Sequence, residues 1–305
     1  MKHKILLSLV AVLLTALSAQ AYDFQSGALY YNTTSDTTVE VAYQSKSSDN
    51  YQGLTTATIP ETVTYNGTTY SVTSIGKSAF KWCSSLTSVT IPTYVTSIGE
   101  CAFAYCSSLT SIVVESSNTM YDSRENCNAI IETASNTLIA GCQSTTIPNS
   151  VTSIGESAFR GCSFLTSVTI PNSVTSIGES AFRGCSSLTS ISIPNSVTSI
   201  GKLAFKLCSS IADIYCYPTT PPVCDDDNTF SGVSKLCNIH VPAGTIPNYQ
   251  VATGWSYFSN FLEISEEAAI SETEQQNKSS RKIIRDGQVL ILRNGVTYDM
   301  MGNTL

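Results

Sequence analysis

A pattern of apolar and polar residues with a period of 23 runs through the middle of the chain. Residues 147–162 read IPNSVTSIGESAFRGC, and this phrase returns almost unchanged from Ile170 and again from Ile193. The same step recurs in two columns of residues: Phe80, Phe103, Phe159, Phe182 and Phe205, followed by Cys83, Cys106, Cys162, Cys185 and Cys208. A unit of this length cannot bury its apolar side chains alone, so the pattern predicts a solenoid of stacked coils.

Each unit is expected to contain one strand and one short helical turn. In residues 188–193 (LTSISI), Ile191 and Ile193 alternate with Ser190 and Ser192, which is the period of a half-buried strand. Stacking of the units would place such strands ~4.8 Å apart. Residues 178–184 (GESAFRG) predict one helical turn closed by glycine.

The phenylalanine column predicts the spine of the core, because it recurs once per coil at the same place. Two units carry glutamate and arginine four residues apart in the predicted turn: Glu156/Arg160 and Glu179/Arg183. On a helix this order favours ion pairing, so solvated pairs are expected there. Two other units carry lysines at the same places: Lys77/Lys81 and Lys202/Lys206. These lysines predict a modest basic patch.

The repeated phrase IPxxVTSIGxxAFxxCxxLTS resembles the BspA-type leucine-rich repeat family of bacterial surface proteins, over roughly residues 54–264. Residues 114–141 resemble a variant repeat of that family, and residues 220–255 resemble its closing cap. The resemblance implies a mostly β leucine-rich repeat solenoid, with short helical turns and a β cap at each end. It also implies surface attachment and binding of host matrix proteins.

The chain is expected to divide into six segments. These are a signal peptide (1–21), an N-terminal β cap (22–57), the solenoid (58–215, with an irregular unit at 114–146), a C-terminal cap (216–264), a linker (265–282) and a short β meander (283–305). The meander is predicted from the turn signals Asp286-Gly287 and Asn294-Gly295. It resembles a truncated form of the C-terminal sorting segments of secreted Bacteroidetes proteins.

The N-terminus has the pattern of a secretory signal peptide. Lys2 and Lys4 precede a short apolar run, and Ala19-Gln20-Ala21 supplies a small-x-small cleavage site. The apolar run is too short to span a membrane, and no later stretch reaches ~18 apolar residues. We therefore expect an exported protein without a transmembrane span, at the cell surface or outside the cell, with the periplasm as the alternative.

Eleven cysteines in an exported chain raise the question of disulfides. The five cysteines of the repeat column are expected to form a buried ladder of small apolar side chains, although neighbouring coils would also bring them within disulfide reach. In the C-terminal cap, Cys216, Cys224 and Cys237 could supply one bridge. An odd total leaves at least one thiol free or intermolecular.

Composition argues against several classes of function. Charged residues make up only 13% of the chain and the formal net charge is −7, which argues against nucleic-acid binding. The two histidines and the absence of a catalytic motif argue against an enzyme, and no cofactor is expected. No cysteine or histidine spacing supports a metal site, and the acidic run at residues 225–227 lacks the spacing of a calcium loop. The sequence thus favours a non-enzymatic protein.

The exposed strand face is the predicted functional surface. Serine and threonine, which together number 83 in the whole chain, are the commonest residues on it. Its candidate partner-binding residues are Ser88, Thr90, Ser167, Thr169, Ser190, Ser192, Asp213 and Tyr215. We expect this face to bind a protein, with a host extracellular matrix protein as the partner that the resemblance implies. The alternatives are a passive structural or envelope spacer and, with less support, a polysaccharide-binding module.

Overall fold

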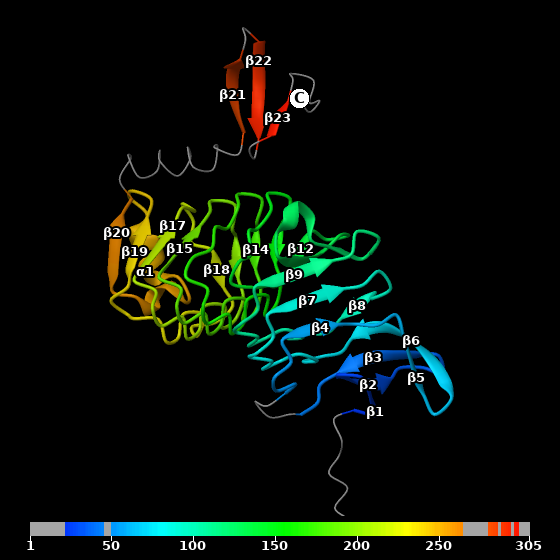
Figure 1. Cartoon of the computed structure of the whole chain (residues 1–305). Helices are drawn as coiled ribbons and strands as arrows, with labels where there is room; N and C mark the ends of the chain where they lie inside the picture. Colours follow the sequence, from blue (N-terminus) through cyan, green and yellow to red (C-terminus); the bar gives the residue numbers. More distant parts are fainter. Residues whose placement is uncertain (1–21, 46–49, 265–279, 286–287, 294–295, 299–305) are drawn as a thin grey trace, which may run out of the picture.

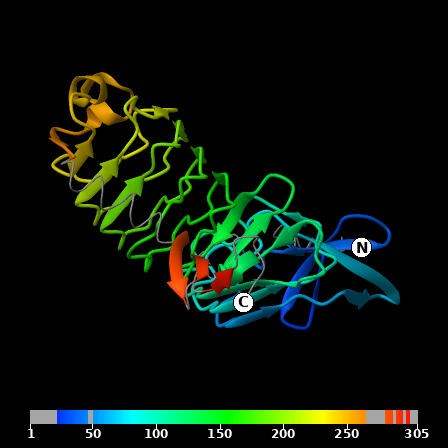
Figure 2. The ribbon, with the colours of Figure 1, turned by 90° about the horizontal axis from the view of Figure 1, so that it is seen from above.

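The computed structural model describes residues 22–45 and 50–264 in full, and the backbone of residues 280–285, 288–293 and 296–298. From residue 50 to 264 the chain winds into stacked coils, which Figure 1 follows from blue to orange. The coils form an elongated row when viewed from above (Figure 2). The prediction of a mostly β repeat solenoid is therefore confirmed.

Two columns of parallel strands run along the row of coils. The first column is the predicted strand face: β4 (Thr56–Thr58), β7 (Ser88–Ile91), β9 (Ser111–Val114), β15 (Ser190–Ile193), β17 (Asp213–Cys216), β19 (Asn238–Val241) and β20 (Asn260–Glu263). The second consists of two-residue strands: β8 (Ser97–Ile98), β13 (Ser153–Ile154), β14 (Ser176–Ile177), β16 (Ser199–Ile200) and β18 (Val223–Cys224). Ser153 pairs with Ser176 and Ser176 with Ser199, so one coil corresponds to one 23-residue period.

The first column is broken in the middle. It forms a three-stranded sheet, β4-β7-β9, and a four-stranded sheet, β15-β17-β19-β20. Residues 166–170 lie between the two sheets and have no strand structure, so the prediction of a strand at Ser167–Thr169 is wrong. The preceding irregular unit has no strand at this column either, in residues 143–148. Residues 166–170 therefore have no strand in the preceding unit with which to form backbone hydrogen bonds, and this accounts for the break.

The irregular unit folds as a hairpin beside the solenoid. It contains β10 (Tyr121–Asp122), the 3-10 turn η1 (Arg124–Asn126), β11 (Ala129–Glu132) and β12 (Thr137–Gly141). β11 and β12 are antiparallel, and β12 then pairs in parallel with β13. The unit therefore enters the second column of strands and leaves the first column interrupted.

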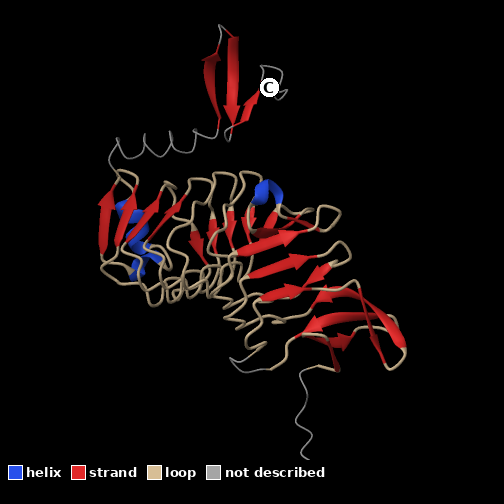
Figure 3. Cartoon of the chain, viewed as in Figure 1, coloured by secondary structure: helices blue, strands red, loops and turns tan. Residues whose placement is uncertain are grey.

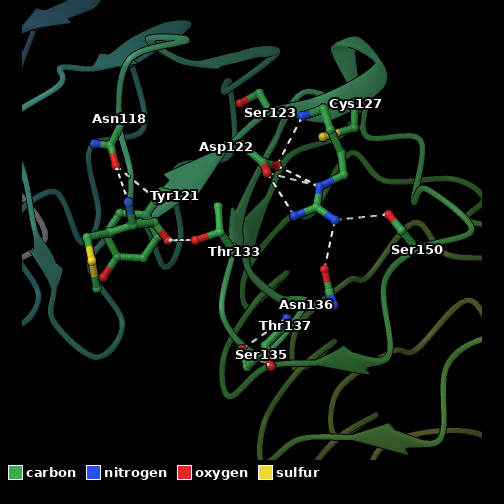
Figure 4. A network of polar contacts seen from close by, with 12 residues as sticks. Asn118, Tyr121, Asp122, Ser123, Cys127, Thr133, Ser135, Asn136, Thr137 and Ser150 are labelled. Atoms are coloured by element: carbon green, nitrogen blue, oxygen red, sulfur yellow. Dashed lines mark hydrogen bonds and ion pairs between the residues drawn. The ribbon is translucent and has the colours of Figure 1, made fainter.

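Polar side chains fix the irregular unit to the coils on both sides, and Figure 4 shows the contacts of Arg124 on the side of the next coil. Arg124 donates to both carboxylate oxygens of Asp122 at 2.7–3.0 Å, and this contact raises the pKa of the guanidinium. Its Nη1 also donates to Asn136 Oδ1 at 2.8 Å and to Ser150 Oγ, at the start of the next coil, at 3.2 Å. On the other side, the buried Asn118 amide donates to two carbonyl oxygens of the preceding coil. The unit is thus joined to the preceding coil by buried hydrogen bonds and to the next coil by an exposed one.

Strands close the N-terminal end of the solenoid. β1 (Phe24–Ser26), β2 (Leu29–Thr33) and β3 (Thr38–Ala42) form an antiparallel meander, and β3 pairs in parallel with β6 (Thr68–Ile75). β5 (Thr62–Tyr65) and β6 form a hairpin at Asn66-Gly67. Both turn residues have positive φ, 50° and 82°, as the turn signal in the sequence predicts.

Apart from η1 in the irregular unit, the helical residues lie at the C-terminal end of the solenoid, and both places are blue in Figure 3. Those at the C-terminal end are α1 (Ile246–Val251) and the 3-10 turn η2 (Trp255–Tyr257), which bury Tyr249 and Trp255. Further on, β21 (Ser280–Arg285), β22 (Gln288–Arg293) and β23 (Val296–Tyr298) form an antiparallel sheet that begins three residues before the predicted meander. The predicted signal peptide (1–21) and most of the linker lie outside the described residues.

The phenylalanine column forms the spine of the core, as predicted. Phe159, Phe182, Phe205 and Phe230 are buried and stack with ring centroids 5.1–5.5 Å apart and interplanar angles of 4–5°. Phe80 and Phe103 form a second stack at 5.4 Å. The two stacks belong to separate hydrophobic clusters, because Gly141 of β12 packs against Phe159 in place of another ring.

The predicted helical turn is not helical. In residues 180–185 the backbone amides alternate between two kinds of acceptor. Ala181 N donates within the turn, to Gly178 O at 3.3 Å, whereas Phe182 N donates to the next coil, to Ala204 O at 2.8 Å. Ser180, with φ 54°, also donates to the next coil. The turn edge, as we call the residues around the phenylalanine of each coil, is therefore a second ladder of hydrogen bonds between coils.

Because the turn is not helical, the predicted ion pairs do not form. In the described residues no ion pair joins Glu156 to Arg160 or Glu179 to Arg183. Instead, Glu156 lies near the glutamates at the same position of neighbouring coils. Burial, and then the nearby carboxylates of Glu100 and Glu179, raise the pKa of Glu156.

All eleven cysteines are free thiols, including the three in the cap that could have supplied a bridge. The column cysteines are buried, as predicted, and they also donate hydrogen bonds. Cys106, Cys185 and Cys208 each donate to the carbonyl of the phenylalanine one coil back, at 3.0–3.2 Å. Burial raises the pKa of the Cys185 thiol well above its ordinary value. The ladder is therefore a packed and hydrogen-bonded part of the core.

Candidate functional site

The structure divides the predicted partner-binding residues among three places. Ser190, Ser192, Asp213 and Tyr215 lie together on the outer face of the four-stranded sheet. Ser88 and Thr90 lie on β7 in the three-stranded sheet, beyond the break. Ser167 and Thr169 are exposed between the sheets, without strand structure. The four-stranded sheet is thus the best-ordered part of the predicted site.

Two outward rows cross this sheet, because β15, β17, β19 and β20 are parallel and in register. One row contains Ser190, Asp213, Asn238 and Asn260, and the other contains Ser192, Tyr215, His240 and Leu262. The residues between them, such as Ile191, Ile214 and Ile239, are buried. The alternation in each strand therefore places every second side chain on this surface.

The first row is a chain of hydrogen bonds centred on Asp213. Asp213 Oδ1 accepts from Asn238 Nδ2 at 2.9 Å and from His240 Nε2 at 2.8 Å. Asn260 Nδ2 then donates to Asn238 Oδ1 at 2.6 Å. The bonds from His240 and Asn238 stabilise the carboxylate and lower the pKa of Asp213. These side chains are therefore held in one arrangement before any partner binds.

The second row adds an aromatic contact. The rings of Tyr215 and His240 stack at 4.3 Å with an interplanar angle of 9°. Beside them, Leu262 of β20 is 40% exposed. Tyrosine is one of the residue types that most often anchor protein interfaces, and here the ring is held in place by His240.

Sequence reasoning placed Asp213 and Tyr215 on this surface but did not include His240, Asn238 or Asn260. The strand alternation in NIHV (238–241) and NFLE (260–263) contains the signal that could have found them. They were missed because Asp213 to Asn238 is 25 residues and Asn238 to Asn260 is 22, so the 23-residue period does not extend into the cap.

The next question is whether acidic, cysteine or histidine side chains gather in the part of the chain that the structure describes. Within residues 22–45 and 50–264, no three histidine, cysteine or acidic side chains lie together as a metal site would need. Asp226 accepts a hydrogen bond from the amide of Asn228 in its own loop, and Asp227 accepts one from the amide of Gly254 before η2. In the same part of the chain, no helix is long and apolar enough to cross a membrane.

Comparison with known proteins identifies the repeat. Residues 51–136 and 130–250 match six copies of the family described as "BspA type Leucine rich repeat region". No curated protein matches the chain.

Similar solved structures are bacterial leucine-rich repeat proteins. One from Eubacterium ventriosum is 25% identical, with a TM-score of 0.49, over 63% of this chain and 52% of that one. A leucine-rich cell surface protein from Faecalibacterium prausnitzii is 20% identical (TM-score 0.40, 76% and 97% covered), and a protein from Bacteroides ovatus is 24% identical (TM-score 0.37, 79% and 61% covered). The chain thus spans about half the length of the Eubacterium ventriosum protein.

Proposed function

Because the chain belongs to the BspA-type leucine-rich repeat family, we propose that it is a non-enzymatic repeat protein that binds a protein partner through its strand face. The proposal places it outside the cell or at the cell surface, where it would serve adhesion to a host or extracellular matrix protein. The predicted signal peptide and the family support export.

The row of Tyr215, His240 and Leu262 beside the hydrogen-bonded Asp213 is the observation that carries this proposal. It supplies a preordered aromatic and apolar centre, and the Ser190 row supplies a polar rim. Interfaces gain most of their affinity from such a centre, since its ordering is complete before binding. A row of serines alone would offer only weak contacts.

A pulldown of the purified protein against immobilised matrix proteins tests the proposal, and two variants locate the contact. In the first, Tyr215 and His240 are both changed to alanine, which removes the stacked centre. In the second, unmatched charge is placed along the strand face: Ser167→Lys, Thr169→Lys, Ser190→Lys and Ser192→Lys. Both variants should lose the captured partner.

The second column of strands provides a matched control. Thr96, Thr152, Thr175 and Thr198 are exposed at the same step along the solenoid. Changing these four to lysine adds the same charge on another side, and it should leave retention unchanged. A passive spacer would retain no matrix protein above background. Equal loss in the control and the strand-face variants would place the contact elsewhere.

A further inference from the structure

The turn edge carries bulky side chains where the backbone favours glycine. The residue two places after the column phenylalanine has positive φ in every coil: Trp82 (68°), Tyr105 (62°), Gly161 (75°), Gly184 (78°) and Leu207 (63°). Glycine adopts this left-handed conformation without strain, whereas a side chain with a Cβ does not. Trp82 is also 39% exposed, so burial does not account for an indole at this place. Positive φ recurs along the turn edge, at Ser180 and Leu207 among others, so it is the exposed indole and not the strain that distinguishes this coil.

Trp82 and Tyr105 stack face to face and form an aromatic platform, in which Tyr105 covers one face of the indole. Their rings stack with centroids 3.8 Å apart and an interplanar angle of 10°. The Arg160 guanidinium lies 5.5 Å from the centre of the Tyr105 ring, and its Nε donates to Tyr105 Oη at 3.4 Å. A Cβ on Gly161 would lie 2.3 Å from the Tyr105 ring, so the ring packs there only because residue 161 has no side chain. The platform is therefore fixed by its neighbours.

A hollow of about 330 Å³ adjoins the platform and is lined by cationic and polar groups. Trp82 and Lys81 line it together with Lys77, Tyr43 and Asn50. The buried Asn50 amide donates to the carbonyl oxygens of Ala79 and Lys81, which fixes this wall. Lys77 pairs with Glu100, whereas Lys81 makes no ion pair within the described residues. The hollow thus combines an indole with an ammonium group that is available to a ligand.

We infer that the turn edge at Trp82 binds an acidic saccharide, such as a chain of hexuronic acid residues. The C–H face of a pyranose ring stacks on an exposed indole, and Lys81 would pair with the carboxylate of the sugar. The volume of about 330 Å³ suits one or two sugar rings and is at the small end for ligand sites. The chain has a net charge of −7, so its attraction for an anion must be local. This site is separate from the strand face.

Tryptophan fluorescence gives a direct test, because Trp82 and the buried Trp255 are the two tryptophans of the chain. Tetragalacturonic acid should change the emission in a saturable manner and protect Trp82 from acrylamide quenching. Its fully methyl-esterified form, which has no charge, should bind about tenfold more weakly. No saturable binding of the acid up to about 10 mM would overturn the inference.

Three variants, measured by calorimetry, assign the contact to the platform. Trp82→Gly removes the indole and relieves the strained backbone, so the fold should persist while the affinity falls about tenfold or more. Lys81→Gln should weaken binding of the acid and leave binding of the ester unchanged. Leu207→Gly makes the same change of backbone strain four coils away in sequence order, at a 49% exposed position, and should not affect binding.

Two outcomes would contradict the site as assigned. If Leu207→Gly lowers the affinity as much as Trp82→Gly, the effect comes from the fold and the inference fails. If poly-L-glutamate binds as tightly as the saccharide and depends equally on Trp82, the site recognises acidic peptides instead. The lysine variants of the strand face should bind the saccharide normally, so failure of the proposed function can be distinguished from failure of this site.

Discussion

Phe182 has an aromatic neighbour on each side in the central part of the solenoid. It stacks on Phe159 at 5.1 Å and on Phe205 at 5.3 Å, and it is fully buried. Phe182→Ala should lower the free energy of unfolding by about 3–5 kcal/mol, because the coils on both sides prevent collapse of the cavity. Denaturant titration measures this change. Phe164→Ala is the control, since that ring is 59% exposed and its loss should cost less than about 0.5 kcal/mol.

Asp213 predicts a dependence of stability on pH. Its pKa is lowered by the bonds from His240 and Asn238, so the folded state holds the charged form more strongly than the unfolded state does. This contribution is present above the unfolded pKa of 3.8, and it is lost as the pH falls through the lower pKa of the folded state. Asp213→Asn should therefore be less stable than the original chain at pH 7, and the difference should narrow towards about pH 2. A difference that stays constant in denaturant titrations at both pH values would argue against a role for this ionisation.

At the level of single residues, the core positions could be predicted from the sequence, but the hydrogen bonds that these residues make could not. The period identified the phenylalanines and cysteines, because one residue type in each coil must fill one repeated space. It did not reveal that Cys185 donates a hydrogen bond to Phe159 O. A cysteine in a repeated position can either donate through its thiol or only fill apolar space, and the sequence does not distinguish the two. The stack of Tyr215 on His240 was also missed, because it depends on pairing between strands 25 residues apart in sequence.

At the scale of a single element, two glycines of the turn edge test how this edge is packed. Gly161 and Gly184 occupy the same position in successive coils, both with positive φ. A Cβ at Gly184 would lie 3.7 Å from its nearest neighbour, so Gly184→Ala should cost only the strain of the backbone, about 1 kcal/mol. A Cβ at Gly161 would lie 2.7 Å from the backbone Cα of Tyr105, so Gly161→Ala should cost clearly more, about 2 kcal/mol or more. Thermal denaturation of the two variants would give the order, and equal costs would contradict the packing of Tyr105 on Gly161.

The elements were predictable where local periodicity decides them. Alternation identified the strands at residues 88–91 and 190–193. The turn edge was assigned as helical because GESAFRG has helix-forming residues and a closing glycine. Its conformation is set instead by bonds to the next coil, such as Phe182 N to Ala204 O, which no local pattern contains. The break at residues 166–170 has the same kind of cause, since it follows from the missing strand in the unit before it.

At the scale of the whole molecule, the solenoid contains two hydrophobic clusters that meet at the irregular unit. One contains Phe80 and Phe103, and the other contains the stack from Phe159 to Phe230. Because coils of a repeat protein contact only their neighbours, we expect native-state hydrogen exchange to resolve two cooperative units with a boundary near residues 114–146. Arg124→Ala removes the bonds to Asp122, Asn136 and Ser150, so it should increase the difference in protection between the two units. Exchange of all coils in a single cooperative step would contradict this division.

The register of the repeats has a consequence for how such a protein changes over generations. Ser153, Ser176 and Ser199 pair directly, and residues 147–162 are repeated almost letter for letter. Unequal recombination between gene segments that encode these units would add or remove 23 residues at a time. Each event would lengthen or shorten the molecule by one rise of ~4.8 Å and leave every remaining contact in place. The length of the solenoid, and hence the spacing between its two ends, is therefore an inherited quantity that can vary in equal steps.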